Sequence, residues 1–421
     1  MRESNMFEGV YNEMRSRPFV VLAVLCASCI TRSTQAADWP MFRGPGGRSI
    51  GEAVDLPLEW AVDVGQNIAW QVDLPGRGVS SPIVVDGKVY LTASSGPNRN
   101  HLHILAFESQ SGEKLWHRKF WATGRTLCHE TSAVAAPTPA SDGTRVFAYF
   151  SSNDIVALDL EGNLLWMRGL ALDYPGAGND IGLSSSPAVV DDVVVVQCEA
   201  QGNSFVAALD TSDGSTRWDT KRPEKSNWST PVAISQTIEG EEVEAVLLHS
   251  AESLGALRAD SGEVLWELPL ECDTISSSVF DTELFVPAGG LRVFDLSKKS
   301  SLLTGPIWSE PKLKSGSPSP VVVDGLVYVI NSAGVLTCGS LESKQLLWRK
   351  RLGGSFWATP VAVGNYLYCI NATGQSFVVD AASGGEIVSE CEFGEDILAS
   401  PAVADNALFV RSHHHLWKIS K

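Results

Sequence analysis

Polar side chains that could bind a metal ion or move a proton gather in two segments of the chain, residues 120–136 and 169–185. They are Arg125, His129, Glu130, Asp173, Asn179 and Asp180. Carboxylate and amide oxygens are donors that calcium prefers, and a histidine or a carboxylate could act as a general base. Loops are polar whatever they do, so the alternative is that these side chains simply face water. The sequence favours this alternative.

Three tryptophans, Trp121, Trp228 and Trp357, stand in segments that we interpret as loops. An indole ring could stack on a flat quinone or on a sugar. The alternative, which the sequence favours, is that these rings pack the loops together.

The sequence contains few signals for a metal site or for a common catalytic motif. The histidine run 413–415 could share a metal ion, but no Cys, Asp or Glu stands beside it at ligand spacing, so we expect an exposed turn. The chain has no Gly-x-Ser-x-Gly elbow, no phosphate-binding P-loop and no His-Glu-x-x-His pair. The cysteines after residue 37 form neither a CxxC nor a vicinal pair, so we predict buried thiols and no metal: Cys128, Cys198, Cys272, Cys338, Cys369 and Cys391.

The candidate residues lie between copies of a repeat, in which Ser-Pro or Thr-Pro opens an apolar run and Gly-x-x-x-Trp closes the copy. The openings stand at positions 82, 139, 187, 231, 279, 320, 360 and 401, where Ser278-Val279 is a degenerate copy. Their spacings are 57, 48, 44, 48, 41, 40 and 41 residues. A period near 40 residues with loop insertions is typical of propeller blades.

Each copy is predicted to form one blade of four antiparallel strands. Residues 320–330, for example, contain two β-branched runs joined by Asp324-Gly325, which is a strong hairpin signal. The hydroxyl residues at the openings recur in every blade, so we interpret them as structural.

One indole per blade is predicted to pack between neighbouring blades, and each such ring would bury about 150–250 Å². These docking residues are Trp70, Trp116, Trp166, Trp218, Trp266, Trp308 and Trp348. Lys344 replaces the turn glycine of the sixth copy, so we expect a less favourable turn there. Val388 replaces the tryptophan of the seventh copy, which predicts a weaker blade.

The last copy, residues 400–419, supplies only three strands, and residues 67–74 read as the missing fourth. We therefore predict an all-β, eight-bladed propeller whose ring is closed when the N-terminal strand completes the last blade. Residues 38–421 would form this single domain.

Residues 1–37 are predicted to be a secretory signal peptide. Arg15 and Arg17 precede an apolar run of 13 residues, 18–30, and small residues follow at Ala36 and Ala37. The run is shorter than the ~20 residues that a membrane helix needs, so we expect a mature chain without a transmembrane segment in the periplasm or another extracytoplasmic compartment. Two alternatives stay open: translation from Met14 and lipidation at Cys29.

The formal charge of −17 and the pI near 4.9 argue against nucleic acid or anionic lipid as a principal partner, because both reward a positive surface.

The motif Ala208-Leu209-Asp210, followed by Gly214 and Trp218, resembles the tryptophan-docking repeat of the pyrroloquinoline quinone (PQQ)-like β-propeller superfamily, which includes quinoproteins and BamB. The leader, residues 38–45, is similar to that of secreted planctomycete-type members. The resemblance covers residues 38–421 and implies one of two functional classes. Quinoprotein dehydrogenases bind PQQ with calcium and carry a vicinal disulfide, which this chain lacks, whereas BamB-type proteins are non-enzymatic scaffolds.

We therefore predict an exported, monomeric, non-enzymatic scaffold that binds a protein or another cell-envelope component and needs no cofactor. The first alternative is a PQQ- and calcium-dependent alcohol or sugar dehydrogenase. The second is a propeller that binds polysaccharide through its loop tryptophans.

Overall fold

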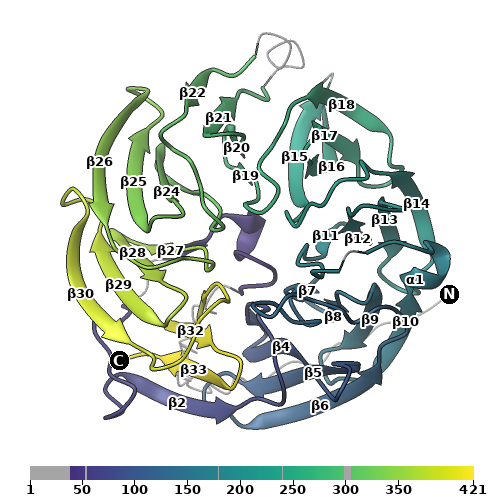
Figure 1. The fold of residues 1–421 in the computed structure, drawn as a ribbon, viewed down its shortest axis with the longest axis horizontal. Coiled ribbons are helices and arrows are strands. Elements are labelled where there is room, and N and C mark those ends of the chain that lie inside the picture. The colour runs from purple at the N-terminus through teal and green to yellow at the C-terminus, as the bar shows by residue number, and fades with distance from the viewer. Residues whose placement is uncertain (1–37, 53–54, 179, 239, 298–304) are drawn as a thin grey trace, which may run out of the picture. The chain divides into compact units, whose positions relative to one another are not determined.

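The computed structural model describes residues 38–421 except 53–54, 179, 239 and 298–304, and these residues form eight antiparallel sheets around one axis (Figure 1). The predicted eight-bladed, all-β propeller is confirmed. The predicted signal peptide lies outside the described residues, so it and the domain boundary after residue 37 stay predictions. Among the described helices, none combines the length and apolar character needed to cross a membrane.

Each blade runs from an inner strand at the axis to an outer strand at the rim of the wheel. Blade one has β3 (Ile83–Val85), β4 (Lys88–Ser95), β5 (His101–Glu108) and β6 (Lys114–Trp121). Blade two has β7 (Ala140–Ser141), β8 (Arg145–Tyr149), β9 (Asp154–Asp159) and β10 (Leu164–Gly169), followed by the short helix α1 (Leu170–Asp173). Blade three has β11 (Ala188–Val190), β12 (Val193–Cys198), β13 (Phe205–Asp210) and β14 (Thr216–Lys221). Blade four has β15 (Val232–Ile238), β16 (Glu241–His249), β17 (Ser253–Arg258) and β18 (Val264–Pro269).

The second half of the wheel repeats this order. Blade five has β19 (Val279–Phe280), β20 (Leu284–Pro287), β21 (Leu291–Phe294) and β22 (Trp308–Glu310). Blade six has β23 (Val321–Val323), β24 (Leu326–Ile330), β25 (Val335–Ser340) and β26 (Gln345–Arg351). Blade seven has β27 (Val361–Val363), β28 (Tyr366–Ile370), β29 (Gln375–Asp380) and β30 (Glu386–Glu392). Blade eight has β31 (Ala402–Ala404), β32 (Ala407–Arg411), β33 (His415–Ile419) and, from the other end of the repeat region, β2 (Ile68–Asp73).

Ring closure follows the prediction, since β2 pairs antiparallel with β33. The indole nitrogen of Trp417 donates a 3.0 Å hydrogen bond to the side-chain oxygen of Gln71, 346 positions away in the chain. The closed ring leaves no blade without its outer strand.

The outer strands dock on the next blade through their tryptophans. A β-bulge next to the indole bends the outer strand. In blade two, for example, the register shifts just before Trp166, which pairs with Ala157. A Cβ added to the turn glycine of the next blade would lie only 2.6–2.7 Å from an indole carbon, so only glycine fits there. The pairs are Trp70 with Gly112, Trp116 with Gly162, Trp166 with Gly214, Trp218 with Gly262 and Trp348 with Gly385.

Two docking tryptophans depart from this arrangement. Trp266 donates its indole N–H to the side chain of Gln236 in its own blade at 2.9 Å. Trp308 packs on Gly339 of β25.

The turn of blade six has Lys344 in place of glycine, and this lysine holds φ at 53°. Val388 in blade seven leaves its side chain 44% exposed.

Blade five begins one residue earlier than the sequence suggests. Pro82 precedes β3, and the residue that precedes β19 is Ser278. The degenerate opening is therefore equivalent to Ser277-Ser278, with Ser278 in the place of proline. The missing proline caused the error.

The segment of residues 38–51, called the plug below, crosses the axis and hydrogen-bonds to inner strands on several sides (Figure 1). Trp39 exchanges backbone hydrogen bonds with Val84 of blade one, and the carbonyl of Pro40 accepts from Ser141 of blade two. The plug contains a 3-10 turn, η1 (Pro45–Gly47), and ends in β1 (Ile50–Gly51), which pairs parallel with β27 of blade seven. The central channel of the propeller is therefore filled at one end by its own N-terminal sequence.

Candidate functional site

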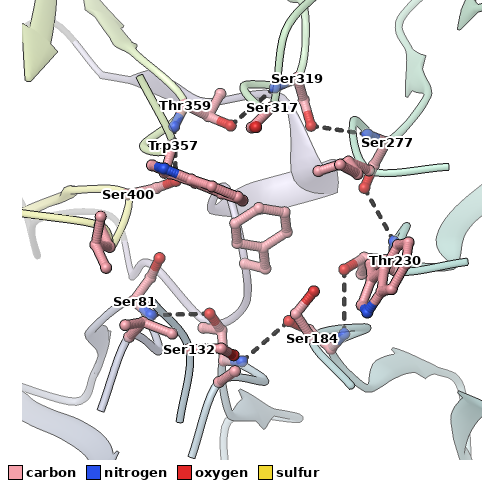
Figure 2. A pocket seen from close by; sticks show the side chains of 18 of the residues that line it. Ser81, Ser132, Ser184, Thr230, Ser277, Ser317, Ser319, Trp357, Thr359 and Ser400 are labelled. Carbon is pink, nitrogen blue, oxygen red and sulfur yellow. Dashed lines mark hydrogen bonds between the residues drawn. The ribbon is translucent and has the colours of Figure 1, made fainter. Parts of the chain in front are cut away.

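The axis holds a cavity of about 440 Å³, called the axial cup below. Every blade contributes to its wall one hydroxyl residue that stands two positions before the inner strand (Figure 2). These eight residues, called the hydroxyl ring below, are Ser81, Thr138, Ser186, Thr230, Ser277, Ser319, Thr359 and Ser400.

The hydroxyl ring links neighbouring blades in one direction around the axis. The backbone N–H of Ser81 donates to the hydroxyl of Thr138 at 2.9 Å, and the same bond recurs at 2.9–3.1 Å from each ring member to the next as far as Ser400. A hydroxyl that accepts from a backbone N–H still has its own hydrogen to donate. The ring is therefore both a structural belt and a set of donors around the cup.

The mouth and the inner end of the cup are apolar. Phe42 of the plug lines the cavity at its closed end, and the side chains Ile181, Trp228, Ile275, Trp357 and Leu398 line it elsewhere. The indole of Trp357 reaches over the cavity (Figure 2). Ile181, Ile275 and Trp357 are 46%, 43% and 42% exposed, so this apolar surface is open to solvent.

His129 is the one ionisable side chain among the residues that line the cup. Its Nδ1 lies 2.8 Å from the hydroxyl of Thr131, which also lines the cavity. A single imidazole beside hydroxyls has no carboxylate to orient it as in a catalytic triad. The cup suits a largely apolar group that carries neutral hydrogen-bond acceptors.

The structure does not bring the other polar candidates that it describes to the cup. Arg125 and Asp180 form an exposed ion pair with each other. Glu130 is exposed, and its backbone carbonyl accepts from Arg77. Asp173 pairs with Arg168 at 2.6 Å beside α1. Asn179 lies outside the described residues.

Two of the three loop tryptophans line the cup, Trp228 and Trp357. The indole nitrogen of Trp228 donates to the carbonyl of Gly182 at 2.8 Å, which fixes the ring. The placement of Trp121 in a loop was wrong, because β6 is eight residues long and ends with Trp121 paired to His101. Its ring is 62% exposed at the end of an outer strand and is not part of the cup.

The histidine run is not simply an exposed turn. His414 is exposed, but His413 and His415 are half-buried. His415 contacts Glu395 and lies 3.3 Å from Asp73, and both carboxylates come from distant parts of the sequence. Within the described ranges, no group of three or more His, Cys, Asp or Glu side chains could hold a metal ion. The six cysteines of the described residues are buried, and none of them forms a disulfide with another.

The donor set of the cup does not fit PQQ with calcium. Calcium needs six to eight oxygen ligands, usually with carboxylates among them. Among the described side chains that line the cup there is no Asp, Glu, Asn or Gln, and no Lys or Arg to neutralise the carboxylates of the quinone.

Two sequence features belong to this site. The recurring hydroxyl residues near each inner strand also form the wall of a cavity, a role that depends on the diameter of the ring. The leader, residues 38–45, which carries part of the family resemblance, contributes Phe42 to the lining of the cup.

Comparison with known proteins gives the family of the chain. The family model described as outer membrane protein assembly factor BamB matches residues 61–180, 179–350 and 298–386. The BamB protein of Yersinia pestis is 24% identical over 257 residues, which are 59% of this chain, and the chain spans only 52% of that relative's length. The structure of BamB from Moraxella catarrhalis matches with a TM-score of 0.62 and 16% identity, covering 84% of this chain and 97% of that one. The quinohemoprotein alcohol dehydrogenase from Comamonas testosteroni matches with a TM-score of 0.67 and 14% identity, covering 90% and 80%. At such identities the structural matches show the fold alone, and the predicted PQQ-like propeller is confirmed. Because the family model covers most of its repeats, the chain belongs to the family described as outer membrane protein assembly factor BamB.

Proposed function

We propose that this chain is an extracytoplasmic, non-enzymatic scaffold that binds a polypeptide of the cell envelope on the face into which the axial cup opens. The observation that carries the proposal is the exposed apolar surface at the mouth of the cup, formed by Ile181, Ile275 and Trp357. Exposed apolar side chains gathered on one face mark interaction sites in soluble proteins.

The mouth could supply useful affinity. Full burial of a large apolar side chain is worth about 1.5–3 kcal/mol. The three residues are a little less than half exposed, so covering them would stabilise a complex by roughly 3 kcal/mol in total, or about 100-fold in affinity. Aromatic residues next to deep pockets are frequent hot spots of protein interfaces.

Three further points support a scaffold. The curated relative from Yersinia pestis is named an assembly factor for outer membrane proteins, and the sequence predicts an export signal. The cup itself carries no pair of ionisable groups for acid–base catalysis.

Site-specific photo-crosslinking in the native cell envelope tests this proposal. A photoreactive amino acid at Ile275 is expected to give discrete adducts with one or a few proteins. The matched control is Leu347 on the outer strand β26, which is 50% exposed but far from the cup lining. Equal adduct patterns from both positions, or none from Ile275, would contradict the proposal.

A binding measurement on the captured partner then isolates the apolar contribution. The double substitution Ile275→Ser and Trp357→Ser is expected to weaken binding by at least tenfold, because it removes most of the exposed apolar surface at the mouth. Leu347→Ser is expected to leave the affinity unchanged.

The dehydrogenase alternative is tested by adding PQQ and calcium and following reduction of an electron-accepting dye with alcohols and sugars. We expect no reduction, because the cup lacks charged groups to hold the quinone and the metal. Sustained dye reduction would replace the scaffold by the enzyme.

Polysaccharide binding is the second candidate, because Trp228 and Trp357 line a cavity rich in hydroxyls. Indole rings that stack on sugars change their fluorescence. Saturable quenching by a glycan, lost in Trp357→Ala, would favour this alternative over a protein partner.

A further inference from the structure

The guanidinium group of Arg43 is buried at the axis with few partners. The residue is 2% exposed, and its Nη2 donates a 2.9 Å hydrogen bond to the backbone carbonyl of Ser278. Its Nε and Nη1 have no hydrogen-bond partner within the described part of the chain. The nearest π face is that of Phe42, 5.4 Å from the guanidinium carbon. Buried cations normally have a counter-charge, and none of the described carboxylates forms an ion pair with Arg43.

The buried ion pair of Arg222 with Glu199 does not include Arg43, and the Nη2 of Arg222 itself has no partner among the described atoms. Arg222 donates through Nε to Glu199 at 2.6 Å, and Asn227 donates to the other carboxylate oxygen at 3.0 Å. Both charged side chains of this pair are buried, with 8% and 0% exposure. The Arg43 charge therefore remains uncompensated beside a neutral network.

Two polar atoms near Ser278 also lack hydrogen-bond partners among the described atoms. The Nδ1 of His249 lies 2.7 Å from the hydroxyl of Ser278, so His249 and Arg43 meet at one residue. The Nε2 of His249 and the hydroxyl of Ser276 are buried and have no partner among the described atoms. Burial, together with the charges of Arg43 and Arg222, lowers the pKa of His249 to about 3, so its ring is neutral. The unpartnered guanidinium nitrogens of Arg43 can only donate, and no described acceptor lies within hydrogen-bonding reach of them.

A small cavity of about 10 Å³ adjoins Arg43 between the plug and blades three and four. Its lining includes Phe42, Gly47, Pro187 and Thr230. A volume of this order holds roughly one water-sized particle. It is too small for phosphate, sulfate or an organic carboxylate.

We propose that Arg43 binds a single monatomic halide, chloride in the cell, in this cavity at the junction of the plug with the wheel. The halide would accept hydrogen bonds from Nε and Nη1 of Arg43 and neutralise its charge. The site adjoins the axial cup, since Phe42 and Thr230 line both cavities, but Arg43 lines only the small one.

Arg411 provides a matched comparison within the same molecule. It is 1% exposed, and burial lowers its pKa to about 9, as it does for Arg43. Its Nε donates to the carbonyl of Ser412 at 2.8 Å, and its Nη1 donates to the hydroxyl of Ser80 at 3.1 Å and to the carbonyl of Thr92 at 2.9 Å. Its Nη2 has no partner among the described atoms, so protein acceptors hold two of the three guanidinium nitrogens of Arg411 but only one of the three in Arg43.

Anomalous diffraction from crystals of the wild-type protein grown in sodium bromide tests the site directly. We expect a bromide peak within hydrogen-bonding distance of Nε or Nη1 of Arg43 and none at Arg411. A peak of ordinary water density without anomalous signal at Arg43 would overturn the proposal. This measurement needs no variant, so it stands even if substitutions of Arg43 prevent folding.

Thermal unfolding in solution gives a second readout. In sodium chloride or bromide the wild-type midpoint is expected to lie a few degrees above that in sodium gluconate at equal ionic strength, because a ligand that binds only the folded state stabilises it. Arg43→Met should lose this halide dependence, whereas Arg411→Met should be less stable but keep it. A halide dependence that survives in Arg43→Met, or none in the wild type, would contradict the site.

Discussion

The docking of an indole on a turn glycine can be measured by adding one methyl group to Gly214. Gly214 holds φ at 73°, and a Cβ there would lie 2.6 Å from Cε3 of Trp166. Gly325, in the hairpin of blade six, holds the same φ of 73°, but a Cβ there would meet nothing within 4 Å. The two glycines therefore share the backbone conformation and differ in the neighbouring ring.

The magnitudes separate the two effects. Placing an L side chain in the left-handed region costs about 1–2 kcal/mol, which applies to both Gly214→Ala and Gly325→Ala. Overpacking against a ring that cannot move costs a further 1–3 kcal/mol or so, and it applies to Gly214→Ala alone. The indole N–H of Trp166 also donates to the carbonyl of Thr211 at 3.0 Å, and displacing the ring would weaken this bond.

Urea unfolding of the two variants, followed by circular dichroism, is the assay. We expect Gly214→Ala to lower the free energy of unfolding by about 1–3 kcal/mol more than Gly325→Ala does. Removing the ring should erase most of that difference, so Gly214→Ala should cost less in a Trp166→Ala background. Equal losses for the two glycine variants in the wild-type background would refute the docking argument.

Three further predictions concern the turn of blade six, the hydroxyl ring and the buried histidine. Lys344→Gly should raise the unfolding free energy by about 1 kcal/mol, because Lys344 holds φ at 53°, and differential scanning calorimetry would show the change as a higher Tm. Ser277→Ala should lower stability in urea by about 1–2 kcal/mol, because the N–H of Thr230 loses its 2.9 Å acceptor, whereas Ser277→Thr should not. The pKa of His249 is depressed to about 3 in the folded protein, so the unfolded chain binds the extra proton first as the pH falls below about 6.5, and stability is lost from there towards pH 3. His249→Gln should flatten the fall in unfolding free energy between pH 6 and pH 4 by up to about 1.4 kcal/mol per pH unit, and an unchanged slope would contradict this origin.

Much of the fold could be predicted, because the blade pattern is local. The spacing of Ser-Pro and Thr-Pro openings predicted eight blades, and residues 67–74 were correctly matched with the three strands at the other end. Blade five was misplaced by one residue because Ser278 stands where other blades have proline. Trp121 was misassigned because β6 is eight residues long, and strand length depends on pairing with β5.

Most residues of the candidate site could not be predicted from the local sequence pattern. All six polar candidates follow from residue type in two long loops, and of the five that the structure describes only His129 lines the cup. Residues 38–51 have no periodic pattern, and their partners are remote: the contact of Arg43 with Ser278 spans 235 positions. Contacts of this kind arise from the assembled ring and leave no trace in local sequence.

The joint between β2 and β33 also bears on the order in which the molecule can be made. Gln71 leaves the ribosome 346 positions before Trp417, its partner across that joint. During most of synthesis, therefore, the blades already made form an open arc in which β2 has no partner. Pairing β2 with β33 is then slow, because closing so long a loop costs conformational entropy. A chain that lacked β33 would leave β2 without its partner and the ring open. The propeller can therefore close only after the five residues of β33 have been synthesised.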